Sequence, residues 1–439
     1  MLLIYSPRIT NRIRYIFNLI FKDILVTDFK IISDIEAFKN FGGAKISYGQ
    51  QPVSDELFFR SANHPDRKEE FLLETEIKKQ NLKVSDWNGI KIFFQTENSS
   101  LPYDPFAASF FLVSRYEEYL PFTPDEYGRF SAKQSLSFQN EFLQKPIVNI
   151  WAQHIKKNIL EKFPGFKFPE IKYNFIPTID IDNAYAYLGK GILRTMGSYV
   201  KALLCFKIAD IKLRTNAIRK KEDPYDTYLF LSSLHLKYNL NPIYFFLLGN
   251  WAKNDKNLSA SSKMMQSLIQ SISLKYDIGI HPSFASNKFP EKIIIEKKRL
   301  STIAKKQITK SRQHFLMLKF PDTYRNLIDA GITDDYSHGY VDEIGFRAGT
   351  CSSFYFYDLQ KEEETKLRIH PFAVMDATLN LYMKLSPEEA IKRTKEIIRE
   401  VKSVHGTFIT IWHNETLSEW KEWTGWRKVY KEIVKDAVL

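Results

Sequence analysis

Cysteine is almost absent from this chain of 439 residues, which contains only Cys205 and Cys351. The two are far apart and form no Cys-x-x-Cys pair, so the sequence excludes a disulfide framework and a thiolate zinc site. Cys351 has no identifiable base among its sequence neighbours. We therefore do not expect it to act as a nucleophile.

Long uninterrupted apolar runs are also missing. The stretch 197–212 is broken by Lys201 and Lys207, which argues against a membrane span of about 20 residues. It is either an amphipathic helix on a surface or, the favoured interpretation, a helix that covers the domain core. The first residues show neither a long apolar segment nor a small-residue cleavage site. We expect a cytoplasmic protein, with peripheral association at the inner membrane face left open.

The positive charge is not concentrated in a block. The net charge is +12, but Lys and Arg are spread among acidic residues, and no basic-aromatic stripe or known binding module is visible. We therefore expect no nucleic-acid partner, whereas an anionic glycan or membrane surface stays open as an alternative. The sequence gives no indication of an oligomeric state.

Two domains are expected from the pattern along the chain. Residues 162–172, KFPGFKFPEIK, combine two prolines and a glycine and mark a boundary. Residues 1–168 are predicted to form a smaller α/β accessory domain of unassigned role. Residues 169–439 alternate strand and helix patterns, which is typical of a parallel barrel or a wound sheet.

Chemically capable side chains follow several predicted strands of the second domain. A β/α barrel carries its catalytic and ligand-binding side chains at the carboxyl ends of its strands, so candidate residues are expected at those ends. They hold Asp180, Asp182, Asn250, His281, His314, Arg347 and His413. Each residue alone has an ordinary structural explanation, such as a helix cap, an ion pair or a hydrogen-bonded core histidine. The set is more informative than any member.

Asp180 and Asp182 stand one residue apart after an apolar run, FIPTIDIDNAY. On a strand they share one face at a separation of about 7 Å. Two desolvated carboxylates at this distance repel each other unless a cation lies beside them. The pair therefore indicates a bound cation. Arg347 lies between Gly345 and Gly349, whose missing side chains leave room for a ligand.

The segments PTIDIDNA, YDIGIHPSFAS, GFRAGT and GTFITIWHN resemble, in order and spacing, the motifs of NodB-homology polysaccharide deacetylases, carbohydrate esterase family 4. The resemblance covers residues 172–417. It implies a distorted (β/α) barrel with one divalent metal, expected to be Zn²⁺, that removes acetyl groups from a glycan or sugar precursor. The N-terminal part is similar to an uncharacterised domain that precedes such deacetylases in some Bacteroidota.

The resemblance also implies roles. Asp180 would be the general base, Asp182 a metal ligand and His413 the general acid, while Arg347 would orient Asp180. Because Ile181 separates two aspartates that are adjacent in the family, their roles could be exchanged. The family's second motif, HxxxH, is matched only by His281.

The other position of that motif holds Ala285. We therefore expect His314, from a neighbouring strand, to be the replacement ligand, so that Asp182, His281 and His314 hold the metal. Two alternatives stay open: a catalytically impaired barrel that only binds a glycan, and a metal-dependent hydrolase of another amide or ester. Asp376 could cap a helix or border the cleft.

Overall fold

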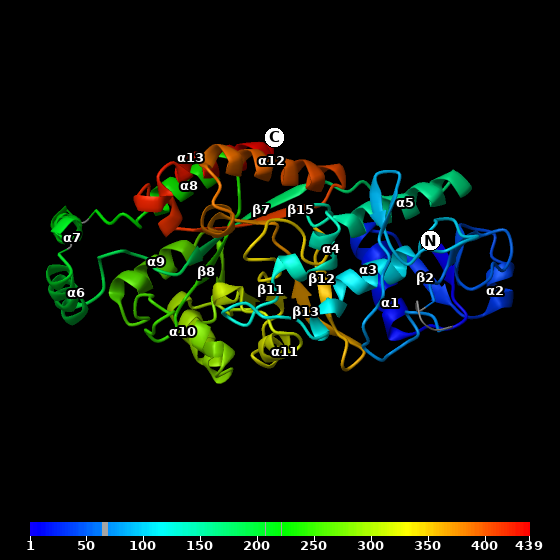
Figure 1. Cartoon of the computed structure of the whole chain (residues 1–439), viewed down its shortest axis with the longest axis horizontal. Coiled ribbons are helices and arrows are strands. Elements are labelled where there is room, and N and C mark those ends of the chain that lie inside the picture. The colour runs from blue at the N-terminus through cyan, green and yellow to red at the C-terminus, as the bar shows by residue number, and fades with distance from the viewer. Residues whose placement is uncertain (64–68, 207, 221) are drawn as a thin grey trace.

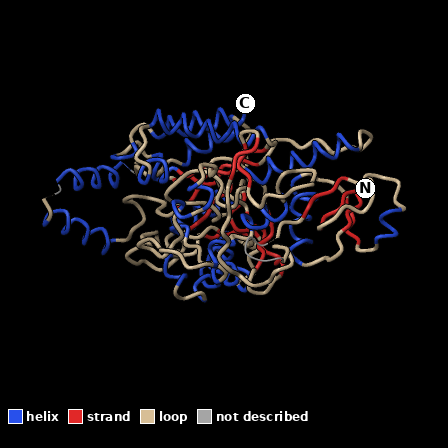
Figure 2. The backbone as a smooth tube through the Cα atoms, turned by 45° about the vertical axis from the view of Figure 1, so that its right-hand side comes forward, coloured by secondary structure: helices blue, strands red, loops and turns tan. Residues whose placement is uncertain are grey.

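The computed structural model describes residues 1–63, 69–206, 208–220 and 222–439. Figure 1 shows an elongated molecule, with the N-terminal part at one end and the helices α6 and α7 at the other. A large sheet occupies the middle, and Figure 2 shows the same arrangement from a second direction. No helix among the described residues is long and apolar enough to cross a bilayer.

The N-terminal part is built on a four-stranded parallel sheet of order β2-β1-β3-β4. Its strands are β1 (Leu2–Tyr5), β2 (Phe29–Ile32), β3 (Lys45–Gly49) and β4 (Leu57–Arg60), and β5 (Ser85–Trp87) pairs with β6 (Ile90–Ile92) in a separate hairpin. Its helices are α1 (Asn11–Phe17), α2 (Ile35–Lys39), α3 (Pro105–Val113), α4 (Leu136–Gln139) and α5 (Ile147–Lys162).

Helix α3 lies at the centre of this part, and all of its residues are buried. Its sequence, PFAASFFLV, is apolar on every side, which is typical of a helix enclosed by core. Asp104 caps the helix by accepting hydrogen bonds from the backbone N–H groups of Phe106 and Ala107, both 2.9 Å long.

The second part contains a nine-stranded sheet of order β12-β13-β11-β10-β9-β8-β7-β15-β14. All pairs are parallel except β12 with β13. The strands are β7 (Asn174–Ile181), β8 (Ile243–Phe246), β9 (Asp277–Ile280), β10 (Lys310–Ser311), β11 (Asp334–Asp335), β12 (Phe354–Asp358), β13 (Glu363–Ile369), β14 (Val374–Met375) and β15 (Thr407–His413).

The α/β class is as expected, but a closed barrel is not formed. Strands β12 and β14 end the sheet, and within the described chain they do not pair with each other. The sheet is nevertheless strongly curved, because Arg312, just after β10, reaches Thr178 on β7, three strands away, with Nη1 2.7 Å from Oγ1. The reason for the open edge is that β12 and β13 fold back as an antiparallel hairpin.

Helices cover the outside of this sheet: α8 (Tyr228–Lys237), α9 (Lys263–Ser273), α10 (Glu291–Ala304), α11 (Asp322–Asp329), α12 (Pro387–Ser403) and α13 (Trp426–Val438). Helix α12 begins with a capping box between Ser386 and Glu389. Trp412 and Trp426 are buried, and the Trp412 ring centroid lies 4.7 Å from that of Tyr430. These tryptophans therefore belong to the core.

The stretch 197–212 does not cover the core, contrary to the favoured interpretation. It lies in two helices, α6 (Ile192–Leu204) and α7 (Ile208–Lys220), which project from the body as a hairpin. Leu204 and Phe206, near the turn, are 75% and 89% exposed. The expected helix breaks because the chain turns back at Phe206, whose φ is +53°. Lys207 lies outside the described residues.

Candidate metal centre

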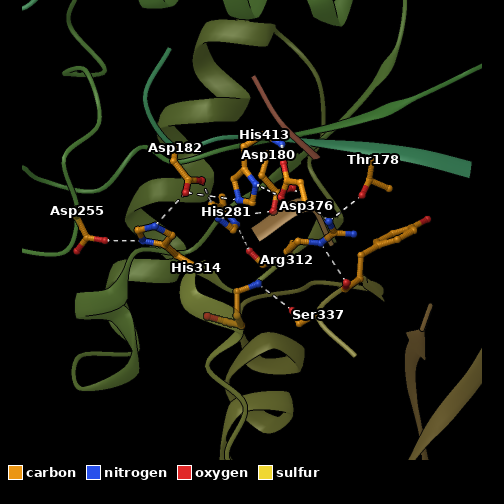
Figure 3. A network of polar contacts seen from close by, with 12 residues as sticks. Thr178, Asp180, Asp182, Asp255, His281, Arg312, His314, Ser337, Asp376 and His413 are labelled. Carbon is orange, nitrogen blue, oxygen red and sulfur yellow. Dashed lines mark hydrogen bonds and ion pairs between the residues drawn. The ribbon is translucent and has the colours of Figure 1, made fainter. Parts of the chain in front are cut away.

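Six neighbouring strands, from β10 to β14 in the sheet order, bring polar side chains to one edge (Figure 3). Asp180 is near the end of β7 and pairs in register with His413 of β15. Asp182 follows one residue beyond β7. Parallel strands place their carboxyl ends at a common edge, so residues far apart in sequence meet there.

Asp182, His281 and His314 form a compact group. Each offers one ligand atom, and these atoms lie within 4.8 Å of one another. His281 Nε2 is 3.1 Å from Asp182 Oδ1, and His314 Nε2 is 3.4 Å from Asp182 Oδ2. One carboxylate and two imidazoles are a donor set suited to zinc and related divalent metals. The structure thus brings together the three residues expected as ligands.

Both histidines are oriented through the nitrogen that faces away from Asp182. His281 Nδ1 lies 2.5 Å from the backbone carbonyl oxygen of Arg312, and His314 Nδ1 lies 3.0 Å from Asp255 Oδ1. Since a carbonyl and a carboxylate only accept hydrogen bonds, Nδ1 donates in each case. With Nδ1 donating, Nε2 is the nitrogen turned towards Asp182, and it is the one that a neutral ring would offer to a metal.

A second observation also indicates that these residues could bind a cation. Asp182 Oδ1 is buried and has no hydrogen-bond partner of good geometry within the described chain, although His281 lies close to it. A buried carboxylate oxygen left unpaired is costly, and a cation would satisfy it. Burial alone would raise the pKa of Asp182, but the charges of three neighbouring histidines lower it well below its usual range.

The surrounding charges also act on His314. Burial would lower its pKa, but the carboxylates of Asp182 and Asp255 raise it to about 9. Asp255 lies in the segment after β8 and accepts hydrogen bonds from the backbone N–H groups of Phe284 and Ala285, at 2.8 and 3.3 Å. Ala285, which replaces the expected second histidine, thus positions the carboxylate that orients the replacement ligand.

Asp180 lies beside the triad but is held by other partners. It is 2% exposed, and Arg312 Nη1 lies 3.3 Å from its Oδ1. Its Oδ2 is 3.9 Å from His281 Nε2, which is longer than the separation between His281 and Asp182. Asp180 therefore keeps a carboxylate oxygen near the centre while an arginine fixes its position.

His413 faces the triad from β15. Its Nε2 is 3.8 Å from Asp182 Oδ2, and its Nδ1 is 2.8 Å from Asp376 Oδ1. Burial would lower the pKa of His413, but the charges of Asp376 and Asp182 raise it well above its usual range. Asp376 is fully buried after β14 and also accepts a hydrogen bond of 2.6 Å from Thr416. Asp376 therefore supports His413, and it also accepts a hydrogen bond of 2.6 Å from the backbone N–H of Ala377, where the next helical segment begins.

Arg347 does not reach Asp180, contrary to the expected contact. It forms a buried bidentate ion pair with Glu118 of the N-terminal part. Gly345, with φ +132°, would place a side chain 2.5 Å from the carbonyl oxygen of Leu143. The glycines of GFRAGT therefore make room for the N-terminal part rather than for a ligand. Arg312 occupies the place beside Asp180 that was assigned to Arg347.

Sequence reasoning missed Arg312 and Asp255 of this site and left the role of Asp376 open. Arg312 stands two positions before His314, and Asp376 directly follows a short strand, so both had a weak positional signal. Asp255 lies in a segment without regular structure and had none. Asn250, one of the strand-end residues, accepts a hydrogen bond of 2.9 Å from Arg299, and within the described chain it forms no hydrogen bond or ion pair with the triad.

A family model matches the N-terminal part only. Residues 2–164 match a family of unknown function (DUF7033). No curated protein matches the chain at a significant level.

Similar solved structures include a protein described as a polysaccharide deacetylase from Mycobacterium smegmatis, at 11% identity and TM-score 0.38, covering 61% of this chain and 86% of that one. A polysaccharide deacetylase from Bacillus cereus gives 11% identity and TM-score 0.31, covering 60% and 86%. A mutant of a CE4 family pseudoenzyme with restored activity gives 10% identity and TM-score 0.28, covering 61% and 62%.

Proposed function

We propose that this protein is a metal-dependent hydrolase that removes acetyl groups from a glycan or a glycan precursor. The observation that supports this most directly is the arrangement around Asp182. Two histidines present Nε2 to it, while Asp180 and His413 lie on its flanks without belonging to the triad. A ligand set, a separate carboxylate and a separate imidazole are the groups that hydrolysis of an amide or ester needs.

Asp182, His281 and His314 would hold the metal, and zinc is the ion that the donor set suits best. When bound, a divalent cation there would act as a Lewis acid and lower the pKa of a bound water from about 15.7 towards 7. With Asp182 in this role, Asp180 is left as the base. We assign the two roles from the contacts: Asp182 lies beside His281, whereas Asp180 pairs with Arg312.

Asp180 takes the proton of the attacking water in this proposal. Arg312 keeps the carboxylate in place through Nη1, and it also donates a hydrogen bond to Thr178 on the same face of β7. A base that is fixed before substrate arrives pays no reorganisation cost, and such proton transfer contributes about 10²–10⁴-fold to the rate.

His413 is assigned as the acid that protonates the departing amine or hydroxyl. The charge of Asp376 raises the pKa of His413 despite burial, which favours the protonated ring that an acid needs. Asp376 accepts hydrogen bonds from the backbone N–H and the ring of His413, at 2.7 and 2.8 Å. The ring therefore holds one orientation, with Nε2 towards the centre.

The substrate class rests on the motif resemblance, which points to acetylated sugars. The experiment is metal analysis of the purified protein together with acetate release from acetylated chitooligosaccharides. We expect close to one divalent ion per chain, loss of that ion in His281→Ala and in His314→Ala, and acetate release that stops in Asp180→Asn while the metal stays. Full activity of Asp180→Asn would refute the assignment of the base.

A second candidate is a glycan-binding protein without catalysis, which the alanine at position 285 favours because one family ligand is missing. In that case sugar binding would persist in His281→Ala and no acetate would be released by the metal-loaded protein. Metal-dependent acetate release that is lost in His314→Ala would exclude this candidate.

A further inference from the structure

The α6–α7 hairpin lies at the end of the molecule opposite the N-terminal part (Figure 1), and it exposes a group of apolar side chains. The side chains, here called the hairpin tip, are 56% to 89% exposed and comprise Met196, Val200, Leu203, Leu204, Phe206 and Ile208. The first four have the spacing i, i+4, i+7 and i+8, which forms one face of α6. A contiguous exposed apolar face is unusual on a protein surface and marks an interaction site.

The base of the hairpin is firmly held, so the exposed tip is not simply a frayed segment. Asp223 accepts hydrogen bonds of 2.7 to 3.0 Å from the backbone N–H groups of Ala186, Tyr187 and Leu188. The two helices are joined by a hydrogen bond of 3.0 Å between the hydroxyls of Tyr199 and Thr215. The hairpin therefore presents its tip from a fixed stem.

The charge of this segment is strongly positive. Residues 190–221 contain nine Lys or Arg and a single acidic residue, a net charge of +8, whereas the whole chain carries +12. Lys212, Arg219 and Lys220 are exposed on α7. Two copies of this surface would repel each other, whereas an anionic surface would attract it.

We propose that the hairpin tip inserts into the headgroup region of an anionic lipid bilayer and anchors the protein there peripherally. Apolar side chains on one face with basic residues around them are the composition of an interfacial helix. Helices α6 and α7 have 13 residues each, fewer than the roughly 20 that a bilayer requires, so the proposed mode is insertion at the interface. The inference is independent of the proposed hydrolysis.

Binding at the tip has a consequence for the metal centre. Asp182 and the start of α6 are separated only by residues 183–191, and Asp223 fixes that segment through three backbone N–H groups. Anchoring at the tip would therefore tether the candidate metal centre to the membrane through a short, hydrogen-bonded segment.

The first test is co-sedimentation of the full chain with vesicles of phosphatidylcholine alone or mixed with phosphatidylglycerol. We expect binding to the mixed vesicles, weakened about tenfold or more in the double variant Leu204→Asp, Phe206→Asp. The matched control is Leu229→Asp, Leu274→Asp, which adds the same charges at side chains 84% and 83% exposed elsewhere. Equal binding by the tip variant and the control would overturn the proposal.

The charge contribution is tested separately. Replacing Lys212, Arg219 and Lys220 by Gln should weaken binding by about fivefold per charge, and added salt should do the same. The control removes three exposed lysines elsewhere, Lys157, Lys172 and Lys275. Binding that is equally strong to phosphatidylcholine alone, or equally weakened by both triple variants, would contradict the role of the hairpin charges.

Insertion itself is reported by a fluorophore on Cys205, because Cys205 is exposed next to the tip and Cys351 is buried. We expect a blue shift of the emission with mixed vesicles. A shift without vesicles that grows with protein concentration would show a second copy on the tip and refute the proposal. His281→Ala should bind vesicles normally, so a failure of catalysis and a failure of anchoring are distinguishable.

Discussion

Single hydrogen bonds set the orientation of each imidazole at the centre. Asp255 accepts from His314 Nδ1, so removing it frees the ring to turn. We expect Asp255→Ala to lower metal affinity by about 10- to 100-fold, measured by competition with a chelator. Asp376→Ala is the control because Asp376 holds His413, which is outside the triad. It should reduce turnover and leave metal affinity unchanged, and a similar loss of affinity in both variants would contradict the ligand assignment.

The two buried arginines, Arg312 and Arg347, should have different roles, and substitutions can distinguish them. Arg312 contacts Asp180, whereas Arg347 contacts Glu118. Lysine keeps the charge but loses the planar fork, so Arg312→Lys should lower the turnover by about tenfold or more, through misplacement of the base. Arg347→Lys should lower the melting temperature and leave the turnover of the folded enzyme near that of the wild type. Turnover and thermal unfolding should be measured on both variants, and equal losses of turnover would contradict the separate roles.

The three residues of the triad could be predicted from the sequence, but the residues that orient them could not. Asp182, His281 and His314 follow strands, and strand ends are recognisable from apolar runs. Nothing in the local sequence of Arg312 or of Arg347 shows which of the two faces Asp180. Their partners are 132 and 229 residues away in the chain, so only the folded structure decides.

Helices α8 and α13 are joined by a buried contact that should make stability depend on pH. His235 of α8 is fully buried, and its Nε2 lies 2.6 Å from Tyr430 Oη of α13. Burial lowers its pKa from 6.5 to about 4. The unfolded chain therefore takes up a proton near pH 6.5 that the folded protein accepts only near pH 4. This contribution is present above pH 6.5 and is lost as the pH falls towards 4.

The full contribution is about 3 kcal/mol, since one pKa unit corresponds to about 1.4 kcal/mol. We expect His235→Gln, which cannot titrate but can still form a hydrogen bond, to show a flatter fall in the free energy of unfolding between pH 6.5 and 4. His405→Gln, at an exposed histidine, should keep the slope of the wild type. Urea unfolding at several pH values measures this, and parallel curves for His235→Gln and wild type would contradict the prediction.

Elements with one clear periodicity were predicted well. The apolar runs of β7 and β15 and the amphipathic pattern of α12 gave correct strand and helix assignments. The apolar run in SRQHFLMLKF, residues 311–320, indicates a long strand, but β10 ends at Ser311. Phe315 and Leu316 have positive φ, so the chain turns there and presents His314 at the centre. An apolar composition alone does not reveal such a turn.

At the scale of the whole molecule, buried hydrogen bonds and an ion pair join the N-terminal part to the larger part. Glu118 pairs with Arg347, and Arg115 donates a hydrogen bond to the Arg347 carbonyl. The backbone N–H of Phe346 donates to Leu143, at 2.8 Å, and that of Val148 to Gly349, at 2.9 Å. These bonds link residues that are about 200 positions apart, which explains why no local pattern indicated how the two parts join.

The buried pair at this junction should couple the unfolding of the two parts. Burial would raise the pKa of Glu118, but Arg347 and Arg115 lower it, which favours a charged carboxylate between the two buried guanidinium groups. Glu118→Ala leaves Arg347 without its carboxylate partner and Arg115 with Glu117 alone, and it should cost about 3–5 kcal/mol. Calorimetry should then show two transitions in place of the single one expected for the wild type.

Lys145→Ala is the matched control, because Lys145 and Glu400 also form an ion pair between the two parts, 2.5 Å long, but Lys145 is 51% exposed. An exposed pair of this kind contributes at most about 1 kcal/mol, so this variant should keep one transition close to that of the wild type. If Glu118→Ala behaved like Lys145→Ala, the charge cluster would not be what joins the two parts, and the coupling would have to come from their apolar contacts alone.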